Sequence, residues 1–392
     1  MLLRLLANAF DALCTIGVAI AVRHSITEIG LTGVKSVGEP SIVPEVVKLG
    51  FGALLYAIGK WSVSKWWRAR AGRQDSMYGL EHGRLHLQAP TPMWMNMGHW
   101  GDGKKQKTMA EACRDLLKAV LAEAGIADVI KAAAVKDKHV QRTLIDLGFG
   151  CGDQTIYLMS EVPPRPQDRE WWDEREHCVK FDHYVGITKD AVQARYATKG
   201  VNDLYAASKA PSGHDVGVIS LFCEDAAGPS SWSPQVIKRI DDGLKDSPEC
   251  WMLALDTAYH FSPSRWPVIQ HAYTQFRASF MAFDLCLSPS ITFKQKLALR
   301  GLTALMGAPW ANFGTSDEYK QKLVAVGYSA ENIKIVDISE HVFGPLAQHL
   351  ADQDSKLKML GLGIGNFSVA KSLFAWWGRS GVVRGVVVVA RR

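Results

Sequence analysis

The stretch that decides the fold is Leu144-Ile145-Asp146-Leu147-Gly148-Phe149-Gly150-Cys151-Gly152-Asp153-Gln154. A short apolar run ends in an acidic residue, and glycines then occupy every second position before a helical pattern begins. Glycine lets the backbone approach a ligand closely, and the first turn of a helix offers free N–H groups to an anionic group. The stretch therefore favours a ligand site at a strand–turn–helix connection; the alternative is an ordinary glycine-rich connection.

The spacing of this turn indicates the ligand that it would take. A dinucleotide site shows G-x-G-x-x-G and binds a pyrophosphate, whereas this turn reads D-x-G-x-G-x-G. An acid directly before the glycines repels phosphate and attracts an ammonium group, which suits the zwitterionic amino-acid end of a cofactor. The candidate cofactor-binding residues of the stretch are Asp146, Gly148, Gly150, Gly152, Asp153 and Gln154.

Alternating strand and helix patterns around this turn predict the fold class. Short apolar runs predict strands at 143–147, 184–187, 215–223, 250–256, 279–287, 333–338 and 385–390. Helical spacing predicts helices at 106–125, 153–160, 190–198, 233–243 and 264–276. This order predicts an α/β fold with a doubly wound, seven-stranded, mostly parallel, Rossmann-like sheet.

Length and composition set the frame for this domain. The chain has 392 residues, more than one average domain, and 47% of them are hydrophobic, which supplies a sizeable core. Its seven cysteines are dispersed without a C-x-x-C pair, so we expect neither a disulfide framework nor a metal site. The chain has no N/D-P-P-Y/F tetrapeptide, and its basic cluster lies beside apolar anchors, so we expect no nucleic-acid partner.

Residues 1–75 are expected to form a hydrophobic and basic helical segment that associates with a membrane. Two apolar stretches, 5–22 and 43–59, are interrupted by polar or charged residues, so neither is a clean span. The second precedes a cluster typical of headgroup anchors: Lys60, Lys65, Trp66, Trp67, Arg68, Arg70 and Arg73. A span, an interfacial hairpin, a cleaved signal peptide, and a helical pair packed on the chain or on a second subunit all stay open.

A family resemblance emerges when the second predicted strand is added to the turn. Residues 95–391 resemble the class I S-adenosylmethionine-dependent methyltransferases. The stretch Gly186-Ile187-Thr188-Lys189-Asp190-Ala191-Val192-Gln193-Ala194 resembles the motif of the tocopherol C-methyltransferase, sterol methyltransferase and cyclopropane-fatty-acid synthase group. Most class I enzymes place an acid where this chain has Thr188, but a neutral residue is normal in this group. The resemblance implies that S-adenosylmethionine is the cofactor, S-adenosylhomocysteine the product, and that Thr188 and Gln193 share the adenosine contacts.

The resemblance also divides the catalytic domain, residues 76–392. It implies a lid at 76–105, a cofactor-binding core at 106–290, and acceptor-cap helices with the last two strands at 291–392. After the third strand, residues 223–227 resemble the adenine loop of the family, in which Asp225 would accept a hydrogen bond from the adenine amine. Glu224 is the neighbouring candidate, and a solvated acidic loop is the alternative.

Two further segments supply candidates on the acceptor side. Met93-Trp94-Met95-Asn96-Met97-Gly98-His99-Trp100 resembles the segment that closes over the cofactor. Gly98 and Trp100 are its cofactor candidates and His99 a catalytic candidate, although the segment could simply pack on the core. Asp256-Thr257-Ala258-Tyr259-His260-Phe261 follows the fourth strand at the carboxyl edge, and the resemblance puts it beside the transferring methyl group.

Within that second segment, Asp256 is a cofactor candidate, and His260 and Tyr259 are catalytic candidates. His260 could remove a proton from the acceptor, because an ordinary histidine pKa near 6.5 suits a general base. The alternative is a buried histidine tied to a carbonyl. A base is needed only if the acceptor loses a proton; otherwise, positioning supplies most of the rate.

The predicted activity is methyl transfer to a hydrophobic small molecule at a membrane. Residues 291–310 and 359–377 are apolar with lysine or arginine at intervals, and in this group such insertions roof the acceptor pocket. They are also consistent with amphipathic surfaces entering the headgroup region, or with ordinary core helices. We expect a lipid-, sterol- or prenyl-like acceptor or a secondary metabolite, a cytoplasm-facing domain such as at the endoplasmic reticulum, and leave open a homo-oligomer. The alternatives are a fatty-acyl cyclopropane synthase and a non-catalytic cofactor-binding protein.

Overall fold

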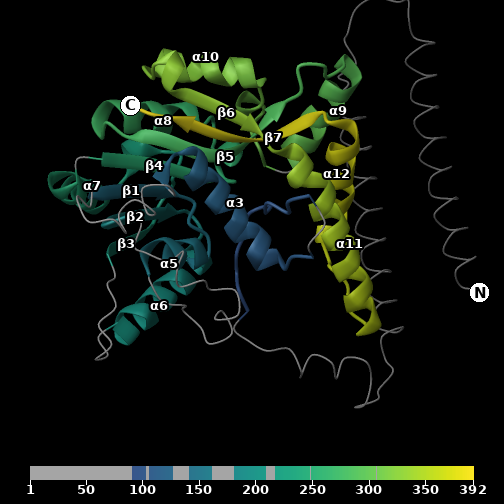
Figure 1. The fold of residues 1–392 in the computed structure, drawn as a ribbon, viewed down its shortest axis with the longest axis horizontal. Helices are drawn as coiled ribbons and strands as arrows, with labels where there is room; N and C mark the ends of the chain where they lie inside the picture. The colour runs from purple at the N-terminus through teal and green to yellow at the C-terminus, as the bar shows by residue number, and fades with distance from the viewer. Residues whose placement is uncertain are drawn as a thin grey trace, which may run out of the picture. The chain divides into compact units, whose positions relative to one another are not determined.

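A computed structural model describes residues 91–102, 106–126, 141–160, 181–208, 217–247, 249–305 and 307–392. The predicted segment 1–75, its boundary with the catalytic domain, and the first part of the predicted lid lie outside these residues. Figure 1 draws these described residues as a coloured ribbon. Within the described residues, no helix combines the length and the apolar character needed to cross a bilayer.

Seven strands form one sheet in the order β3-β2-β1-β4-β5-β7-β6. The strands are β1 (Arg142–Leu147), β2 (His183–Thr188), β3 (Val218–Cys223), β4 (Glu249–Leu255), β5 (Ser279–Leu287), β6 (Ile333–Asp337) and β7 (Val383–Ala390). β7 runs antiparallel to both β5 and β6, and the other pairs are parallel. The predicted α/β, mostly parallel, seven-stranded fold is therefore confirmed.

Helices cover both faces of this sheet (Figure 1). The strands alternate their side chains between two apolar clusters, as Leu144 and Ile145 of β1 show. The Leu144 cluster includes residues of α3 (Met109–Glu123), α5 (Asp153–Met159), α6 (Ala191–Ser208), α11 (Phe343–Met359) and α12 (Phe367–Ser380). The Ile145 cluster includes residues of α7 (Pro234–Asp246), α8 (Trp266–Gln275) and α10 (Ser316–Val326).

One helix differs from the sequence prediction. α6 was predicted to end at residue 198 but continues to Ser208, because Val201 and Leu204 keep the helical spacing of Ala197 and are buried with it. Gly200 is accommodated inside the helix. The apolar insertion 359–377 contains the end of α11 at Met359, a connection, and α12 from Phe367 onward.

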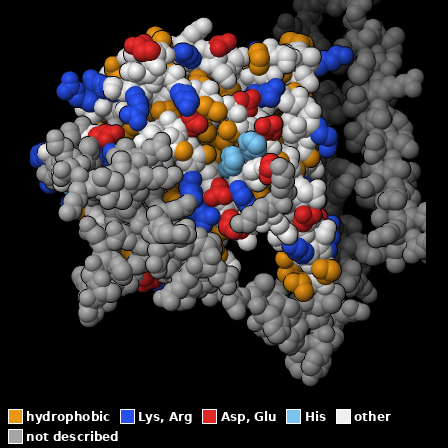
Figure 2. Space-filling view, in the orientation of Figure 1, with side chains coloured by type: hydrophobic (Ala, Val, Ile, Leu, Met, Phe, Trp, Pro, Cys, Tyr) orange, Lys and Arg blue, Asp and Glu red, His pale blue; other side chains and the backbone are white. Residues whose placement is uncertain are grey.

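Helices α11 and α12 expose hydrophobic side chains where they meet. At the junction of α11 and α12, Met359, Phe367 and Val369 are exposed, and Figure 2 shows hydrophobic side chains gathered at the lower end of α11. Asp354 fixes this junction, because it pairs with Lys358 of α11 and Lys371 of α12. A further helix, α9 (Phe293–Leu305), follows β5 and is also partly exposed.

Candidate active site

The candidate site lies at the point where the strand order of the sheet reverses, between β1 and β4. β1 has β2 on one side and β4 on the other, so the connections after β1 and β4 lead away from each other and leave a crevice at their carboxyl ends. The glycine turn follows β1, and Asp256 follows β4. The sequence-predicted turn and the predicted acceptor-side segment are thus brought together.

Three glycines shape the turn, and each has a positive φ: 90° at Gly148, 63° at Gly150 and 92° at Gly152. A Cβ at Gly148 would lie 2.6 Å from Thr257 Cγ2, and a Cβ at Gly152 would lie 2.8 Å from Ala197 Cβ. These two glycines therefore allow close packing against Thr257, which follows β4, and against α6. A Cβ at Gly150 would instead lie 3.5 Å from Met95 Sδ, so it would meet only this side chain, at ordinary contact distance.

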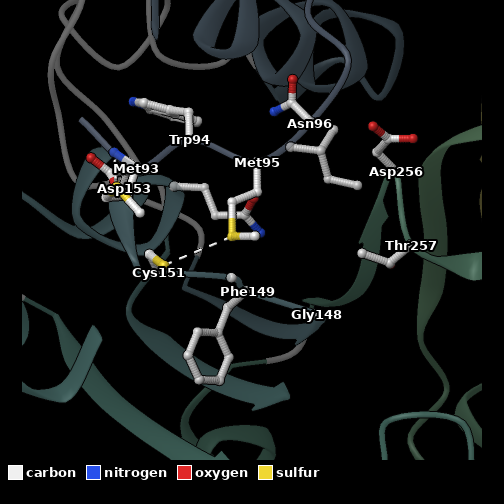
Figure 3. Close-up of a pocket in the computed structure, with 13 residues that line it drawn as sticks. Met93, Trp94, Met95, Asn96, Gly148, Phe149, Cys151, Asp153, Asp256 and Thr257 are labelled. Atoms are coloured by element: carbon white, nitrogen blue, oxygen red, sulfur yellow. Dashed lines mark hydrogen bonds between the residues drawn. The ribbon is translucent and has the colours of Figure 1, made fainter. Parts of the chain in front are cut away.

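A cavity lies in front of the turn (Figure 3). Its lining joins the lid, the turn, the start of α5 and the end of β4: Met93, Trp94, Met95, Asn96, Gly148, Phe149, Gly150, Cys151, Asp153, Gln154, Leu255, Asp256 and Thr257. The Met95 side chain projects into it, and its sulfur lies 3.8 Å from Cys151 Sγ. Met95 therefore fills part of the space above the glycines.

Two carboxylates hold the lid segment across the cavity. The backbone N–H of Met93 donates to Asp153 Oδ2 at 3.1 Å, and that of Met97 donates to Asp256 Oδ2 at 2.7 Å. The two acceptors belong to α5 and to the connection after β4, so they lie on opposite sides of the crevice. Both were predicted as cofactor-binding residues, and the structure gives both a contact with the lid.

Asp256 has an unusual environment. Its φ of 62° is in the left-handed region, which is uncommon for a residue other than glycine and marks strain that other contacts must support. Besides Met97, its carboxylate accepts a hydrogen bond at 2.9 Å from the Tyr259 hydroxyl. Burial raises the pKa of Asp256 to about 7, while the bonds from Tyr259 and Met97 act in the opposite direction. Its charge therefore changes near neutral pH.

Asp146 does not line the cavity. It is fully buried beneath the turn, where one carboxylate oxygen accepts hydrogen bonds from the Tyr184 hydroxyl and, at 2.7 Å, from Gln154 Nε2. Its other oxygen, Oδ1, has no hydrogen-bond donor among the described residues. Burial raises the pKa of Asp146 to about 6. Asp146 therefore contacts the site only indirectly, through its hydrogen bond from Gln154, which lines the cavity.

The predicted adenosine contacts lie along the same edge of the sheet, outside the cavity lining. Thr188 ends β2, and its hydroxyl is 3.5 Å from Gln193 Oε1. Glu224 follows β3, and its backbone N–H donates to the Thr188 carbonyl at 2.9 Å. The Glu224 carboxylate accepts from the Ser233 N–H at the start of α7, and Asp225 Oδ1 accepts from the Ala227 N–H at 3.0 Å, but of the two only Asp225 is exposed. Asp225 is thus the more available of the two acids.

Tyr259 and His260 belong to the 3-10 helix η5 (Ala258–His260), directly after Asp256. Their ring centroids are 4.3 Å apart. Asn312, in the 3-10 helix η6 (Trp310–Asn312), fixes this connection by donating to the carbonyls of Tyr259 at 3.1 Å and Phe261 at 2.8 Å. Burial and the nearby Lys189 charge lower the His260 pKa, while a hydrogen bond with the Gly307 backbone raises it.

The other candidates of this segment, Gly98, Trp100 and His99, lie outside the lining of this cavity, and their predicted roles stay predictions. A Cβ at Gly98 would lie 2.8 Å from Ala112 Cβ, so this glycine lets the lid pack on α3. Trp100 is buried, and its ring centroid lies 4.5 Å from that of His349 on α11. His99 contacts His341, at 5.0 Å between centroids. Residues 93–96 line the cavity in their place.

Several contributors were missed by the sequence analysis. Thr257 lines the cavity and donates to the Leu147 carbonyl at 2.7 Å, and Cys151 lines it within the turn. Cys151 belongs to the glycine turn and Thr257 to the segment after β4, so their place in these two motifs could have identified them. Tyr184 and Asn312 act through contacts between residues far apart in the chain, for which the sequence carries no local signal.

Comparison with known proteins supports the fold assignment. No protein-family model and no curated protein matches the chain. A structure from Galdieria sulphuraria, provisionally assigned as a sarcosine dimethylglycine methyltransferase, aligns with a TM-score of 0.50 and 12% identity, covering 80% of this chain and 98% of that one. This chain therefore has the class I methyltransferase fold.

Two other solved structures align less closely. Geranyl diphosphate C-methyltransferase from Streptomyces coelicolor A3(2) has a TM-score of 0.42 and 12% identity, covering 81% of this chain and 100% of that one. A cyclopropane synthase from Mycobacterium tuberculosis has a TM-score of 0.45 and 11% identity, covering 76% and 90%.

Proposed function

We propose that the chain is an S-adenosylmethionine-dependent methyltransferase that acts on a hydrophobic small molecule at a membrane surface. The observation that carries this proposal is the cavity at the switch point of the sheet, where the glycine turn, Asp153 and Asp256 meet the lid. The class I fold is consistent with methyl transfer, but a fold alone does not establish a function, so the proposal rests on the residues of the site.

The residues present fit such a cofactor. A Cβ at Gly150 would face the cavity and meet only Met95 at ordinary contact distance, and Asp153 and Gln154 line the cavity with polar groups. The carboxyl ends of the neighbouring strands β3, β2, β1 and β4 carry, in that order, Asp225, Thr188, the glycine turn and Asp256. This row offers polar acceptors at one end for an adenosine and carboxylates at the other for an ammonium group.

Entry of the cofactor requires the lid to move. Met95 lies over the glycines, and the bonds of Met93 and Met97 hold it there. Asp153 and Asp256 would exchange these backbone donors for donors of the ligand. The two carboxylates would thus hold the lid in the absence of the cofactor and bind the cofactor when it is present. Met93, Trp94 and Met95 would then exclude water from the site.

The bound cofactor supplies an electrophilic methyl group, and the chain's own residues orient the acceptor and handle its proton. The Tyr259 hydroxyl donates a hydrogen bond to Asp256 Oδ1, which leaves the lone pairs of the phenolic oxygen free to accept a hydrogen bond. Because its pKa is lowered, His260 is neutral near pH 7, and a ring nitrogen can accept a proton from an acceptor that loses one. These residues would hold acceptor and donor in line.

The experiment that tests this function identifies the product. The full-length protein is incubated with S-adenosylmethionine carrying a labelled methyl group and with a lipid extract, and the products are separated by mass spectrometry. We expect a hydrophobic compound to gain one methyl group, about 14 Da, and to carry the label. Gly150→Ala, which should bind the cofactor about tenfold more weakly, serves as the matched low-activity control at a cofactor concentration below its dissociation constant. Label in no compound, or equal label with the control, would contradict the proposal.

A further inference from the structure

Helix α9 presents a hydrophobic face that no described element covers. Phe293 is 80% exposed and Leu297 is 64% exposed. They are four residues apart, so they lie on the same side of the helix. Leu299 and Thr303, also four residues apart, are buried against the domain. The outward pair is therefore unpartnered, although the helix itself is anchored.

The same helix is basic. Lys294, Lys296 and Arg300 are exposed, and the sequence of α9 contains no acidic residue. Among the described carboxylates, none pairs with these three side chains, whereas Lys238 and Lys245 of α7 both pair with Asp242. Two large apolar side chains with three unneutralised cations around them match the composition of an interfacial helix.

α9 also lies on the acceptor side of the candidate site. It follows the carboxyl end of β5 and packs on η6, and η6 packs on η5. Asn312 of η6 bonds the carbonyl of Tyr259, and the Gly307 backbone, just after α9, bonds His260. A molecule that reaches α9 is therefore close to the residues proposed to handle the acceptor.

We propose that α9 docks the domain on an anionic lipid bilayer, with Phe293 and Leu297 entering the acyl boundary and Lys294, Lys296 and Arg300 contacting the headgroups. The inference rests on the proposed function in one respect, that the acceptor is membrane-borne. The positive charge of α9 favours an anionic bilayer over a second copy of the chain or the basic cluster of its own N-terminal segment. A second copy bound face to face would oppose three cations with three cations, and the basic cluster within residues 60–73 would also be repelled.

The test uses the full-length protein and vesicles of phosphatidylcholine, alone or mixed with phosphatidylglycerol. Two measurements are made: the partition constant by co-sedimentation, and hydrogen exchange of the α9 amides. We expect slower exchange in α9 only with the anionic vesicles, and recovery of fast exchange at high salt because the charges are screened. The exchange readout reports on α9 even if another segment also holds the protein on the vesicle.

Two variants separate the contributions. Phe293→Ser/Leu297→Ser should lower the partition constant about tenfold or more, because each side chain loses apolar burial. Lys294→Gln/Lys296→Gln/Arg300→Gln should lower it by on the order of 10²-fold, since each basic residue near an anionic surface contributes about fivefold. The matched control, Lys238→Gln/Arg239→Gln/Lys245→Gln, removes the same charge from α7, which lies at the opposite end of the view from α9 (Figure 1).

Three outcomes would overturn the inference. They are unchanged α9 exchange with anionic vesicles, an equal loss of partitioning in the α7 control, and a vesicle-free dimer that Phe293→Ser/Leu297→Ser dissociates. Binding of S-adenosylhomocysteine is measured separately by calorimetry without vesicles. If the wild-type protein does not bind S-adenosylhomocysteine, the proposed function alone is contradicted. If it binds S-adenosylhomocysteine but α9 does not dock on anionic vesicles, this inference alone is contradicted.

Discussion

Gly150→Ala should separate ligand binding from folding, because its Cβ would enter the cavity and not the packed protein. The nearest atoms would be those of Met95, at 3.5–3.9 Å, which is ordinary contact. The main folding cost is the φ of 63°, which disfavours alanine by about 1 kcal/mol. The added methyl group occupies the wall that the cofactor would contact, so we expect affinity to fall about tenfold or more.

Gly152→Ala is the matched comparison. Here the Cβ would lie 2.8 Å from Ala197 Cβ and 3.0 Å from Ala197 Cα, so the backbone of α6 has to shift. We expect a loss of roughly 2–4 kcal/mol from overpacking and backbone strain together. Urea unfolding gives both stabilities, and calorimetry with S-adenosylhomocysteine gives affinity. Wild-type affinity in Gly150→Ala, or equal destabilisation by the two variants, would refute this assignment of the glycines.

Four further predictions concern single features. The folded-state pKa of Asp256 is raised from 3.8 to about 7, so its favourable contribution to stability is present below pH 4 and is lost as pH rises to 7. The free energy of unfolding of Asp256→Asn, relative to that of the wild type, should therefore rise by about 2 kcal/mol when the pH is raised from 5 to 8. Thermal unfolding with parallel pH profiles for the two proteins would contradict this. Asp225→Ala should weaken S-adenosylhomocysteine binding by about 1.5–3 kcal/mol in calorimetry, and unchanged affinity would remove it from the site. His260→Ala should lower turnover by about 10²–10⁴-fold and remove a limb of the pH–rate profile without loss of cofactor binding; normal turnover would make it a packing residue. Removing residues 1–72 should weaken vesicle binding and leave cofactor binding intact, and equal sedimentation would exclude this segment as the main anchor.

The sequence predicted the sheet well, because local patterns determine it. Apolar runs flanked by turn residues placed all seven strands, and the D-x-G-x-G-x-G spacing placed the turn at the end of β1. The end of α6 was missed because a glycine inside a helix resembles a stop, while burial of Val201 and Leu204 outweighs its cost.

The site was only partly predictable. A motif shows that Asp146 and Gln154 lie near a ligand, but only the fold shows that Asp146 is buried and reaches the cavity through Gln154. Similarly, the sequence of the lid does not show that Gly98 and Trp100 pack on α3 and α11 while residues 93–96 face the turn. Such distinctions depend on contacts between distant parts of the chain.

The central claim is that S-adenosylmethionine binds in the cavity between the lid and the glycine turn. Ultraviolet cross-linking of the labelled cofactor to the full-length protein, followed by peptide mapping, tests it most directly. We predict label in peptides that contain Met93–Met97 or Gly148–Asp153, and its loss when excess S-adenosylhomocysteine competes. Label confined to other peptides, or label that the competitor does not displace, would contradict the claim.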